Sequence, residues 1–311
     1  MIHLSIIIPY FNTALLLQKL LDSIPMQEDL EVIVIDDNST QNQDIYHTIT
    51  QNKKYQNVLF LKNTTPYKGP GASRNIGIEK AQGKWILFAD ADDFFLENFY
   101  SNISPYFTSN EEVVFFIPTS IDLETGEQGN RHLYFEKRLK NYLNNPSLKN
   151  ELNLRYETIN SCFKMIQKEF LIKNHIFFEP VLAYEDNVFA VKLGFFMRQF
   201  SISPQMIYCI THNKESITAN KNEQYLDLQI NAYIQRALFL KEKLPKKHYK
   251  MLVNKGSFFI LQKLHFGLKN ALQTFFLLKK NKIPPIKPKF YNPFYLVYRI
   301  LKKLIVKKVK T

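Results

Sequence analysis

The chain has 311 residues, of which 45% are hydrophobic and 22% charged. That length is typical of about two domains, and the composition excludes wholesale disorder. The two cysteines, Cys162 and Cys209, are too few for a disulfide framework or a cysteine-based zinc site, so we expect a reducing, cytoplasmic setting. The sequence shows no signal-peptide pattern, and no apolar run approaches the ~20 residues that span a bilayer.

The net charge of +13 is unevenly distributed along the chain. Residues 243–311 hold 18 Lys or Arg and no Asp or Glu, whereas residues 1–242 hold 23 basic and 28 acidic residues. A mildly acidic body is therefore followed by a strongly basic tail. Such a tail predicts an anionic partner, either an acidic membrane face or nucleic acid.

The first hundred residues alternate between buried-strand and helix patterns. Four short apolar runs predict strands at residues 4–9, 31–35, 58–61 and 85–89. Helical spacing of apolar residues predicts helices at 13–24 and 72–81. This alternation predicts an α/β fold in which helices flank a mostly parallel central sheet. Ligands of such sheets bind at the carboxyl ends of the strands.

Polar residues stand where these predicted strands end: residues 10–12, Asp36 with Asp37, and the acidic stretch 90–93. Neither a G-x-G-x-x-G fingerprint nor a G-x-x-x-x-G-K-[ST] loop is present in the sequence. Carboxylates repel a diphosphate unless a divalent cation lies between them. Hard oxygen ligands favour Mg²⁺ or Mn²⁺, so the pattern indicates a metal-bridged nucleoside diphosphate.

Four segments carry a family resemblance: SIIIPYFN, EVIVIDDNST, GPGASRNIGIEKAQGKWILFADADD and LAYEDNVF. In this order they resemble the signature of family 2 glycosyltransferases of the GT-A fold, closely over residues 3–100 and more loosely over 180–220. The resemblance implies inverting transfer of a sugar from a nucleotide-diphosphate donor, most often a UDP-sugar. The implied acceptor is a hydroxyl of a glycan or lipid-linked molecule, commonly in capsule or lipopolysaccharide synthesis.

The resemblance also implies donor-site roles. Asp37 would accept the imide N–H of the base, Asp90 would contact the ribose, and Asp92 would coordinate Mn²⁺ or Mg²⁺. The remaining residues implied to bind the nucleotide sugar are Pro9, Tyr10, Asn12, Arg74 and His212. Tyr10 would line the base pocket and Arg74 would lie near the base and phosphates. His212, or Lys214, would contact the diphosphate, because Thr211 replaces the arginine commonly found there. The role of Asp93 is left open.

Asp186, with Glu185 beside it, matches the family's acceptor-activating base. An inverting transfer needs a carboxylate that removes the acceptor proton as attack proceeds. A neighbouring Glu185 would raise the proton affinity of Asp186, which suits a base working near neutral pH. Both residues could instead be acids that favour the start of a helix, and Asp36 and Asp37 could instead form a turn.

The rest of the chain supports a three-part division: a nucleotide-sugar-binding half at 1–105, an acceptor-binding half at 106–222, and a helical basic region at 223–311. A strand is predicted at 113–118 and an acceptor-side insertion at 131–149. Residues 294–310 form a basic amphipathic pattern, and 256–280 is similarly mixed. We expect this region to hold the enzyme peripherally on the inner face of the cytoplasmic membrane, although packing on the catalytic body is the alternative.

Two other functions are compatible with parts of the sequence. A non-catalytic protein could use the basic tail to bind nucleic acid or a membrane, but the body carries acidic motifs and no nucleic-acid-binding signature, so no nucleic-acid partner is expected. A sugar nucleotidyltransferase would normally have a Gly-rich, basic phosphate loop after the first strand, where Tyr10, Phe11 and Asn12 stand.

Overall fold

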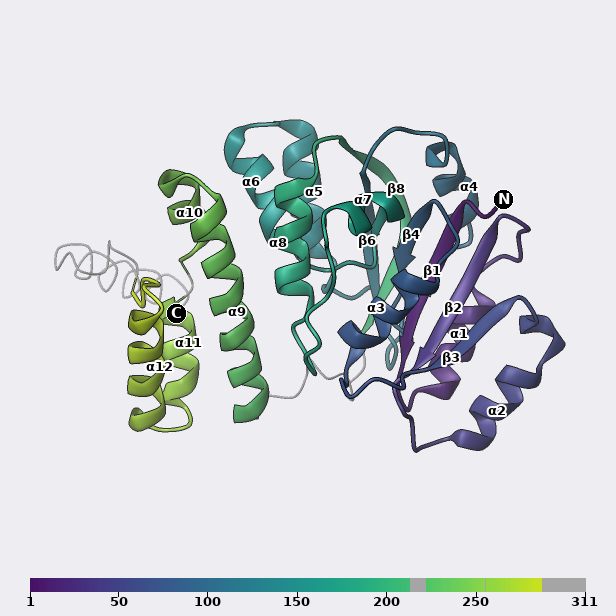
Figure 1. Ribbon diagram of the computed structural model, residues 1–311, viewed down its shortest axis with the longest axis horizontal. Helices are drawn as coiled ribbons and strands as arrows, with labels where there is room; N and C mark the ends of the chain where they lie inside the picture. Colours follow the sequence, from purple (N-terminus) through teal and green to yellow (C-terminus); the bar gives the residue numbers. More distant parts are fainter. Residues whose placement is uncertain (213–221, 255, 287–311) are drawn as a thin grey trace, which may run out of the picture. The chain divides into compact units, whose positions relative to one another are not determined.

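The computed structural model in Figure 1 describes residues 1–212, 222–254 and 256–286. The chain divides into two compact units, Met1–Lys221 and Asn222–Thr311. The start of the second unit lies next to the start predicted for the basic helical region. The sequence predicted a donor half and an acceptor half that meet at residue 105. In the structure a single sheet runs through both halves, so they differ in predicted role and not in fold.

In the described part of the first unit, eight strands form one sheet in the order β3-β2-β1-β4-β7-β6-β8-β5. The strands are β1 Leu4–Tyr10, β2 Leu30–Asp36, β3 Val58–Lys62, β4 Trp85–Phe88, β5 Phe94–Phe95, β6 Val113–Asp122, β7 Lys164–Gln167 and β8 Phe200–His212. β1 pairs in parallel with β2 and β4, β2 with β3, and β6 with β8. The predicted α/β fold with a mostly parallel sheet is therefore confirmed.

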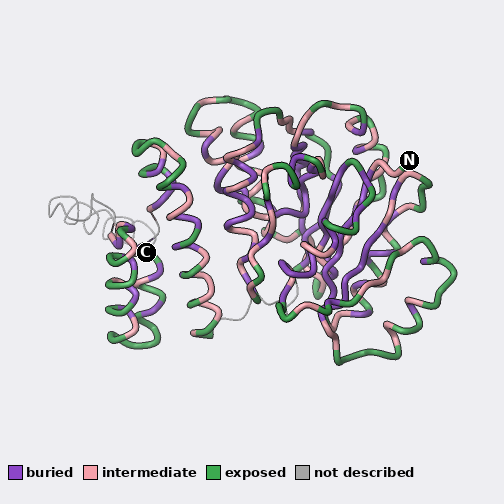
Figure 2. Tube along the Cα trace, in the orientation of Figure 1, coloured by how far each residue is buried: buried purple, intermediate pink, exposed green. Residues whose placement is uncertain are grey.

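β7 runs against this direction, because it pairs antiparallel with both β4 and β6. It joins the donor-side strands to the strands that follow residue 105. All seven residues of β1 are buried, as are those of β4. Figure 2 shows the same burial along the central strands. Such burial on both faces explains why these segments are near-continuous apolar runs in the sequence.

Helices flank the sheet on the same unit (Figure 1). They are α1 Ala14–Asp22, α2 Gln43–Gln51, α3 Pro70–Lys80, α4 Phe99–Ile103, α5 Leu133–Asn144, α6 Leu148–Glu157, α7 Lys168–Lys173 and α8 Asp186–Phe196, with 3₁₀ turns at Lys53–Tyr55 and Ser104–Tyr106. α3 begins two residues before the predicted start because Pro70 occupies its first turn, where a missing N–H costs nothing. The polar stretch 131–149 folds largely as α5.

The second unit is helical over its described residues: α9 Glu223–Lys243, α10 Lys246–Leu252, α11 Gly256–Leu264 and α12 Leu268–Lys280. The side chain of Asn222 caps α9 by accepting a 2.9 Å hydrogen bond from the backbone N–H of Tyr225. Within the described residues, no helix is both long enough and apolar enough to cross a bilayer. The predicted amphipathic segment 294–310 lies outside the described residues.

Candidate active site

Asp37 follows β2 and is held by three hydrogen bonds. Its backbone N–H donates to the carbonyl of Tyr10 over 2.8 Å. Its Oδ1 accepts from Nδ2 of Asn63 over 2.6 Å, and its Oδ2 accepts from the N–H of Gly69 over 2.7 Å. Each carboxylate oxygen keeps a second lone pair, so Asp37 can still accept a hydrogen bond from a ligand.

The residues at the end of β1 shape the same edge of the sheet. The ring of Tyr10 is 1% exposed and stacks on Tyr46 at 4.7 Å, and burial raises the pKa of Tyr10. Pro9 is also buried. The Oδ1 of Asn12 accepts from the N–H groups of Thr40 and Gln41 over 2.7 and 3.0 Å. In this structure Tyr10 packs into the core and Asn12 orders the loop after β2; their donor-binding roles stay predictions.

The glycines at the start of α3 pack against the segment that leads to Asp186. Gly69 has a φ of +103°, and a Cβ built there would lie 2.5 Å from the carbonyl oxygen of Val181. A Cβ at Gly71 would lie 2.4 Å from the carbonyl oxygen of Glu179 and 3.0 Å from Cβ of Glu185. Only glycine permits this approach, which brings two distant predicted motifs together.

Arg74 links two of these motifs through its guanidinium. Its Nη2 donates to Oδ1 of Asp90 over 2.6 Å and its Nη1 to Oε1 of Glu185 over 2.5 Å, and it lies 5.1 Å from the centre of the Phe178 ring. Arg74 is 2% exposed. Burial alone would lower its pKa, but the carboxylates of Asp90, Asp186 and Glu185 outweigh burial and raise it. The anions that Arg74 faces here are the protein's own.

The aspartates of the D-x-D-D stretch after β4 differ in their exposure to solvent. The side chain of Asp90 is 34% exposed and Asp92 is half-buried. Burial, followed by the charge of Asp90, raises the pKa of Asp92 to about 6. Asp93 is buried, and its Oδ1 accepts from the N–H of Thr211 over 2.7 Å, while Oγ1 of Thr211 donates to the carbonyl of Asp92 over 2.6 Å. Asp93 thus fastens β8 to the turn, and Asp90 and Asp92 remain accessible.

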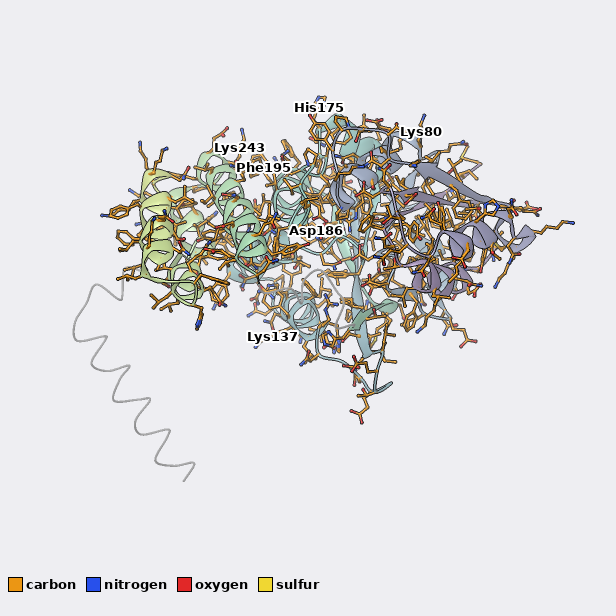
Figure 3. The ribbon with its side chains drawn as sticks, turned by 90° about the horizontal axis from the view of Figure 1, so that it is seen from below. Lys80, Lys137, His175, Asp186, Phe195 and Lys243 are labelled. Carbon is orange, nitrogen blue, oxygen red and sulfur yellow. The ribbon has the colours of Figure 1, made fainter. Side chains whose placement is uncertain are left out.

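Asp186 is the first residue of α8 and is labelled in Figure 3. Oγ of Ser161 donates to its Oδ1 over 3.1 Å. Burial raises the pKa of Asp186 to about 7; Arg74 opposes this rise, and the charge of Glu185 adds to it. Lys164 also favours the ionised carboxylate, as a nearby cation. A carboxyl that titrates near neutrality can act as a general base.

Four residues that contact or influence this site were not predicted from the sequence: Asn63, Ser161, Lys164 and Tyr208. Lys164 is 1% exposed, and burial lowers its pKa to about 8 while its Nζ donates to the carbonyl of Thr158 over 2.5 Å. The hydroxyl of Tyr208 accepts from the N–H of Asp90 over 2.9 Å. A lysine inside the apolar run SCFKMI was the one local signal that could have revealed Lys164.

His212 is exposed at the end of β8, where its carbonyl accepts from the N–H of Leu123 over 3.2 Å. Its predicted diphosphate contact stays a prediction, and Lys214 lies outside the described residues. Thr211, found where an arginine is common in the family, contributes instead to the turn that carries Asp92.

A divalent cation is compatible with this donor set. The described residues contain no cluster of three or more His, Cys, Asp or Glu side chains placed to hold a metal ion. Mg²⁺ and Mn²⁺, however, are commonly bound by one or two carboxylates together with substrate phosphates. Asp92 supplies hard oxygen ligands next to Asp90, whose charge already disfavours ionisation of Asp92. A cation at Asp92 would relieve that repulsion.

Comparison with known proteins identifies the family. The model of Glycosyl transferase family 2 matches residues 5–173, more than half of the chain. The chain belongs to glycosyl transferase family 2. The family 2 signature recognised in the sequence is therefore confirmed.

Among curated relatives, the chain is 43% identical over 96 residues to the poly(ribitol-phosphate) beta-glucosyltransferase of Bacillus spizizenii, covering 29% of this chain and 15% of the relative. It is 36% identical over 104 residues to the GalNAc(5)-diNAcBac-PP-undecaprenol beta-1,3-glucosyltransferase of Campylobacter jejuni, covering 32% of this chain and 33% of the relative. The matched stretches thus span a third or less of each relative.

Solved structures share the fold at low identity. Residues 1–349 of S. aureus TarS in complex with UDP-GlcNAc superpose with a TM-score of 0.69 at 19% identity, covering 96% of this chain and 88% of that one. The Pyrobaculum calidifontis mannosyltransferase PcManGT in complex with GDP-Man and Mn²⁺ gives a TM-score of 0.58 at 16% identity, covering 89% and 75% of the two chains. These neighbours support the GT-A fold predicted from the sequence.

Proposed function

We propose that this protein transfers a sugar from a UDP-sugar to a hydroxyl of a glycan or lipid-linked acceptor, with inversion at the anomeric carbon, in the synthesis of a bacterial surface polysaccharide. The observation that carries the proposal is the pair of bonds from Arg74 to Asp90 and Glu185. Arg74 and Glu185 are 111 residues apart in sequence. Their contact brings the D-x-D-D turn next to the residue that precedes Asp186, which supports the proposal.

The comparisons support both substrates of this proposal. The TarS neighbour binds UDP-GlcNAc, which favours a uridine donor, although PcManGT binds GDP-Man. The curated relatives act on poly(ribitol-phosphate) and on an undecaprenol-linked glycan, which favours a polyhydroxylated or lipid-linked acceptor. Capsule and lipopolysaccharide are the surface polymers expected from the sequence resemblance.

In the proposed reaction, Asp186 takes the proton of the acceptor hydroxyl while that oxygen bonds to the anomeric carbon. The bond between this carbon and the diphosphate oxygen breaks, and its electron pair leaves with UDP. Ser161 orients the carboxylate of Asp186 through its 3.1 Å hydrogen bond, and Arg74 stabilises the ionised form electrostatically. Asp186 can perform this step only when ionised, so its pKa of about 7 sets the usable pH range.

Asp92 is the residue that would hold Mn²⁺ or Mg²⁺, and Asp90 would contact the ribose. When bound, such a cation neutralises the charge that develops on the leaving diphosphate. Asp37 would orient the base through its free lone pairs, because Asn63 and Gly69 already fix its carboxylate. Donor binding and proton removal are therefore assigned to different carboxylates.

A membrane setting completes the proposal. The 18 basic residues of 243–311 are suited to an anionic lipid surface, so we expect the protein to work peripherally on the inner face of the cytoplasmic membrane, close to a lipid-linked acceptor. The anchor predicted at 294–310 lies outside the described residues and stays a prediction.

A panel of UDP-sugars, scored by divalent-cation-dependent release of UDP, tests the donor assignment. The expected result is release with one or a few sugars, stimulated by acceptor, and an acceptor-stimulated release that falls by about 100-fold or more in Asp186→Asn. Formation of a UDP-sugar from UTP and a sugar phosphate would favour a nucleotidyltransferase instead. Salt-dependent binding to duplex DNA, with no UDP release from any donor, would favour the nucleic-acid-binding alternative.

A further inference from the structure

The hairpin formed by α11 and α12 exposes large apolar side chains to solvent. Leu268 is 67% exposed and Phe276 62%. The hairpin face, as we call this surface, consists of Phe258, Leu261, Leu268, Leu272 and Phe276. Large apolar side chains that gather exposed on two neighbouring helices mark an interaction surface.

These side chains are not needed to pack the two helices. Phe259 and Lys263 are the buried side chains of α11, and Ala271, Thr274 and Leu278 are those of α12. Leu268, Leu272 and Phe276 recur every four residues, which places them along one side of α12, away from its buried side. α11 and α12 lie next to each other in Figure 1. The hairpin therefore has a packed inner side and an apolar outer side.

Charge indicates what the outer side contacts. Exposed lysines stand among the apolar residues, at positions 269, 279 and 280, and residues 243–311 contain neither Asp nor Glu. The acidic residues at the start of α9, Glu223 and Asp227, both bind the buried Nζ of Lys263, at 2.8 and 2.7 Å. They therefore neutralise Lys263 on the inner side of α11, whereas the outer lysines lie in a stretch of sequence without acidic residues.

We propose that the hairpin face binds the surface of an anionic lipid bilayer, with its apolar side chains among the upper acyl segments and its lysines at the headgroups. A helix pair with exposed apolar side chains beside lysines matches the chemistry of such an interface. The inference rests on the membrane setting of the proposed function and deepens it, because it names α11 and α12 as helices that contact the lipid. If a second copy of the chain covered this face instead, the experiments below would show it.

The first experiment uses a tryptophan reporter in the full chain. The sequence has a single tryptophan, Trp85, which is 0% exposed in β4 and should not respond to lipid. In Phe276→Trp, vesicles of phosphatidylcholine and phosphatidylglycerol should shift the added emission to the blue, and brominated acyl chains should quench it. Pure phosphatidylcholine should give a weaker effect, because it lacks the anionic headgroups.

Two results would overturn the proposal. Emission already blue-shifted without vesicles, whether or not it depends on protein concentration, would show that the chain or a second copy covers the face. Unchanged emission with vesicles that bind the protein would show that lipid contact lies elsewhere. Neither readout uses UDP release, so failure here is separable from failure of the proposed sugar transfer.

A second experiment compares vesicle partitioning of two triple variants. Leu261→Ser/Leu272→Ser/Phe276→Ser should lower the partition coefficient by roughly ten-fold or more, because interfacial affinity scales with buried apolar area. The matched control replaces exposed apolar residues of the first unit, Leu15→Ser/Leu59→Ser/Ile172→Ser, and should stay within about two-fold. Equal partitioning of both variants would contradict the proposal. Circular dichroism checks that the helices persist.

Discussion

Arg74 and Glu185 form an ion pair of 2.5 Å in which both side chains are almost fully buried, with 3% and 7% exposure. The pair connects the start of α3 to the residue just before α8. The same guanidinium also binds Asp90, whose side chain is more accessible. A buried cation shared by two carboxylates fixes their separation, so Arg74 sets the distance between the D-x-D-D turn and the candidate base.

Replacing Arg74 should therefore destabilise the fold strongly. Arg74→Met leaves the buried carboxylate of Glu185 without a cation, which should lower the free energy of unfolding by about 3–5 kcal/mol. Arg74→Lys should fall between Arg74→Met and wild type, because one ammonium cannot reproduce the two directed bonds. Urea unfolding measures both. The control is Lys140→Met, which removes a surface pair with Glu136 and should cost about 0–1 kcal/mol. Equal losses for Arg74→Met and Lys140→Met would contradict the assigned role of burial.

Asp186→Asn should separate donor binding from chemistry. The proposed role of Asp186 involves only the acceptor proton, so UDP affinity measured by calorimetry should stay within a few-fold of wild type. The transfer rate should fall by about 100-fold or more, the usual scale for losing a general base. Loss of UDP binding in this variant would instead place Asp186 in the donor site.

The same substitution should stabilise the protein at high pH. The fold raises the pKa of Asp186 from 3.8 to about 7, so it disfavours the ionised carboxylate. The unfavourable contribution is complete above pH 7, shrinks as pH falls, and is gone below the unfolded pKa. Asp186→Asn should therefore gain on the order of 1–3 kcal/mol over wild type at pH 8, and much less at pH 4. An equal difference at both pH values would show that the carboxyl is not perturbed.

The pH dependence of turnover provides a separate test of Ser161. Wild-type kcat/KM should fall as pH drops through about 7, since protonated Asp186 cannot accept the acceptor proton. Ser161→Ala removes a hydrogen bond to the ionised form and should move this limb to higher pH by about 0.5–1 unit. Ser101→Ala removes an exposed hydroxyl of α4 that donates to the carbonyl of Asn98, and it should leave the limb in place. If the acidic limb of the kcat/KM profile did not move in Ser161→Ala, Ser161 would have no role in the ionisation of Asp186.

The sequence predicted the strands of the donor side and the positions of the acidic residues at their ends, because both depend on local residue patterns. Short apolar runs predicted the strands of the donor side. The acidic residues at the ends of β2 and β4 lie at the same edge because a parallel sheet presents its carboxyl ends together. Pro70 shows the limit of this reasoning: helical spacing started the helix at residue 72, whereas the proline extended it to residue 70.

Contacts between distant segments could not be predicted in this way. Ser161 bonds Asp186 and the charge of Lys164 acts on it because β7, which Lys164 begins, inserts antiparallel between β4 and β6. No periodicity of the sequence encodes this strand order. Arg74 was expected to face the phosphates, and its charge does face anions, but these are Asp90 and Glu185. Burial of the Tyr10 ring likewise depends on α2, which supplies Tyr46.

The last prediction tests the proposed metal ligand against its neighbour. Asp92→Asn should abolish the response of UDP release to Mn²⁺ and lower turnover by a few hundred-fold, about 3–4 kcal/mol of transition-state stabilisation, with the fold intact. Asp93→Asn is the matched control, because Asp93 points inward to the N–H of Thr211 and an amide oxygen can still accept that bond. It should keep the Mn²⁺ response. The measurement is a titration of both variants with Mn²⁺, together with an assay of wild type in chelator. Near-normal turnover of Asp92→Asn in Mn²⁺ would contradict a cation at Asp92. Full activity of wild type in chelator would contradict it as well.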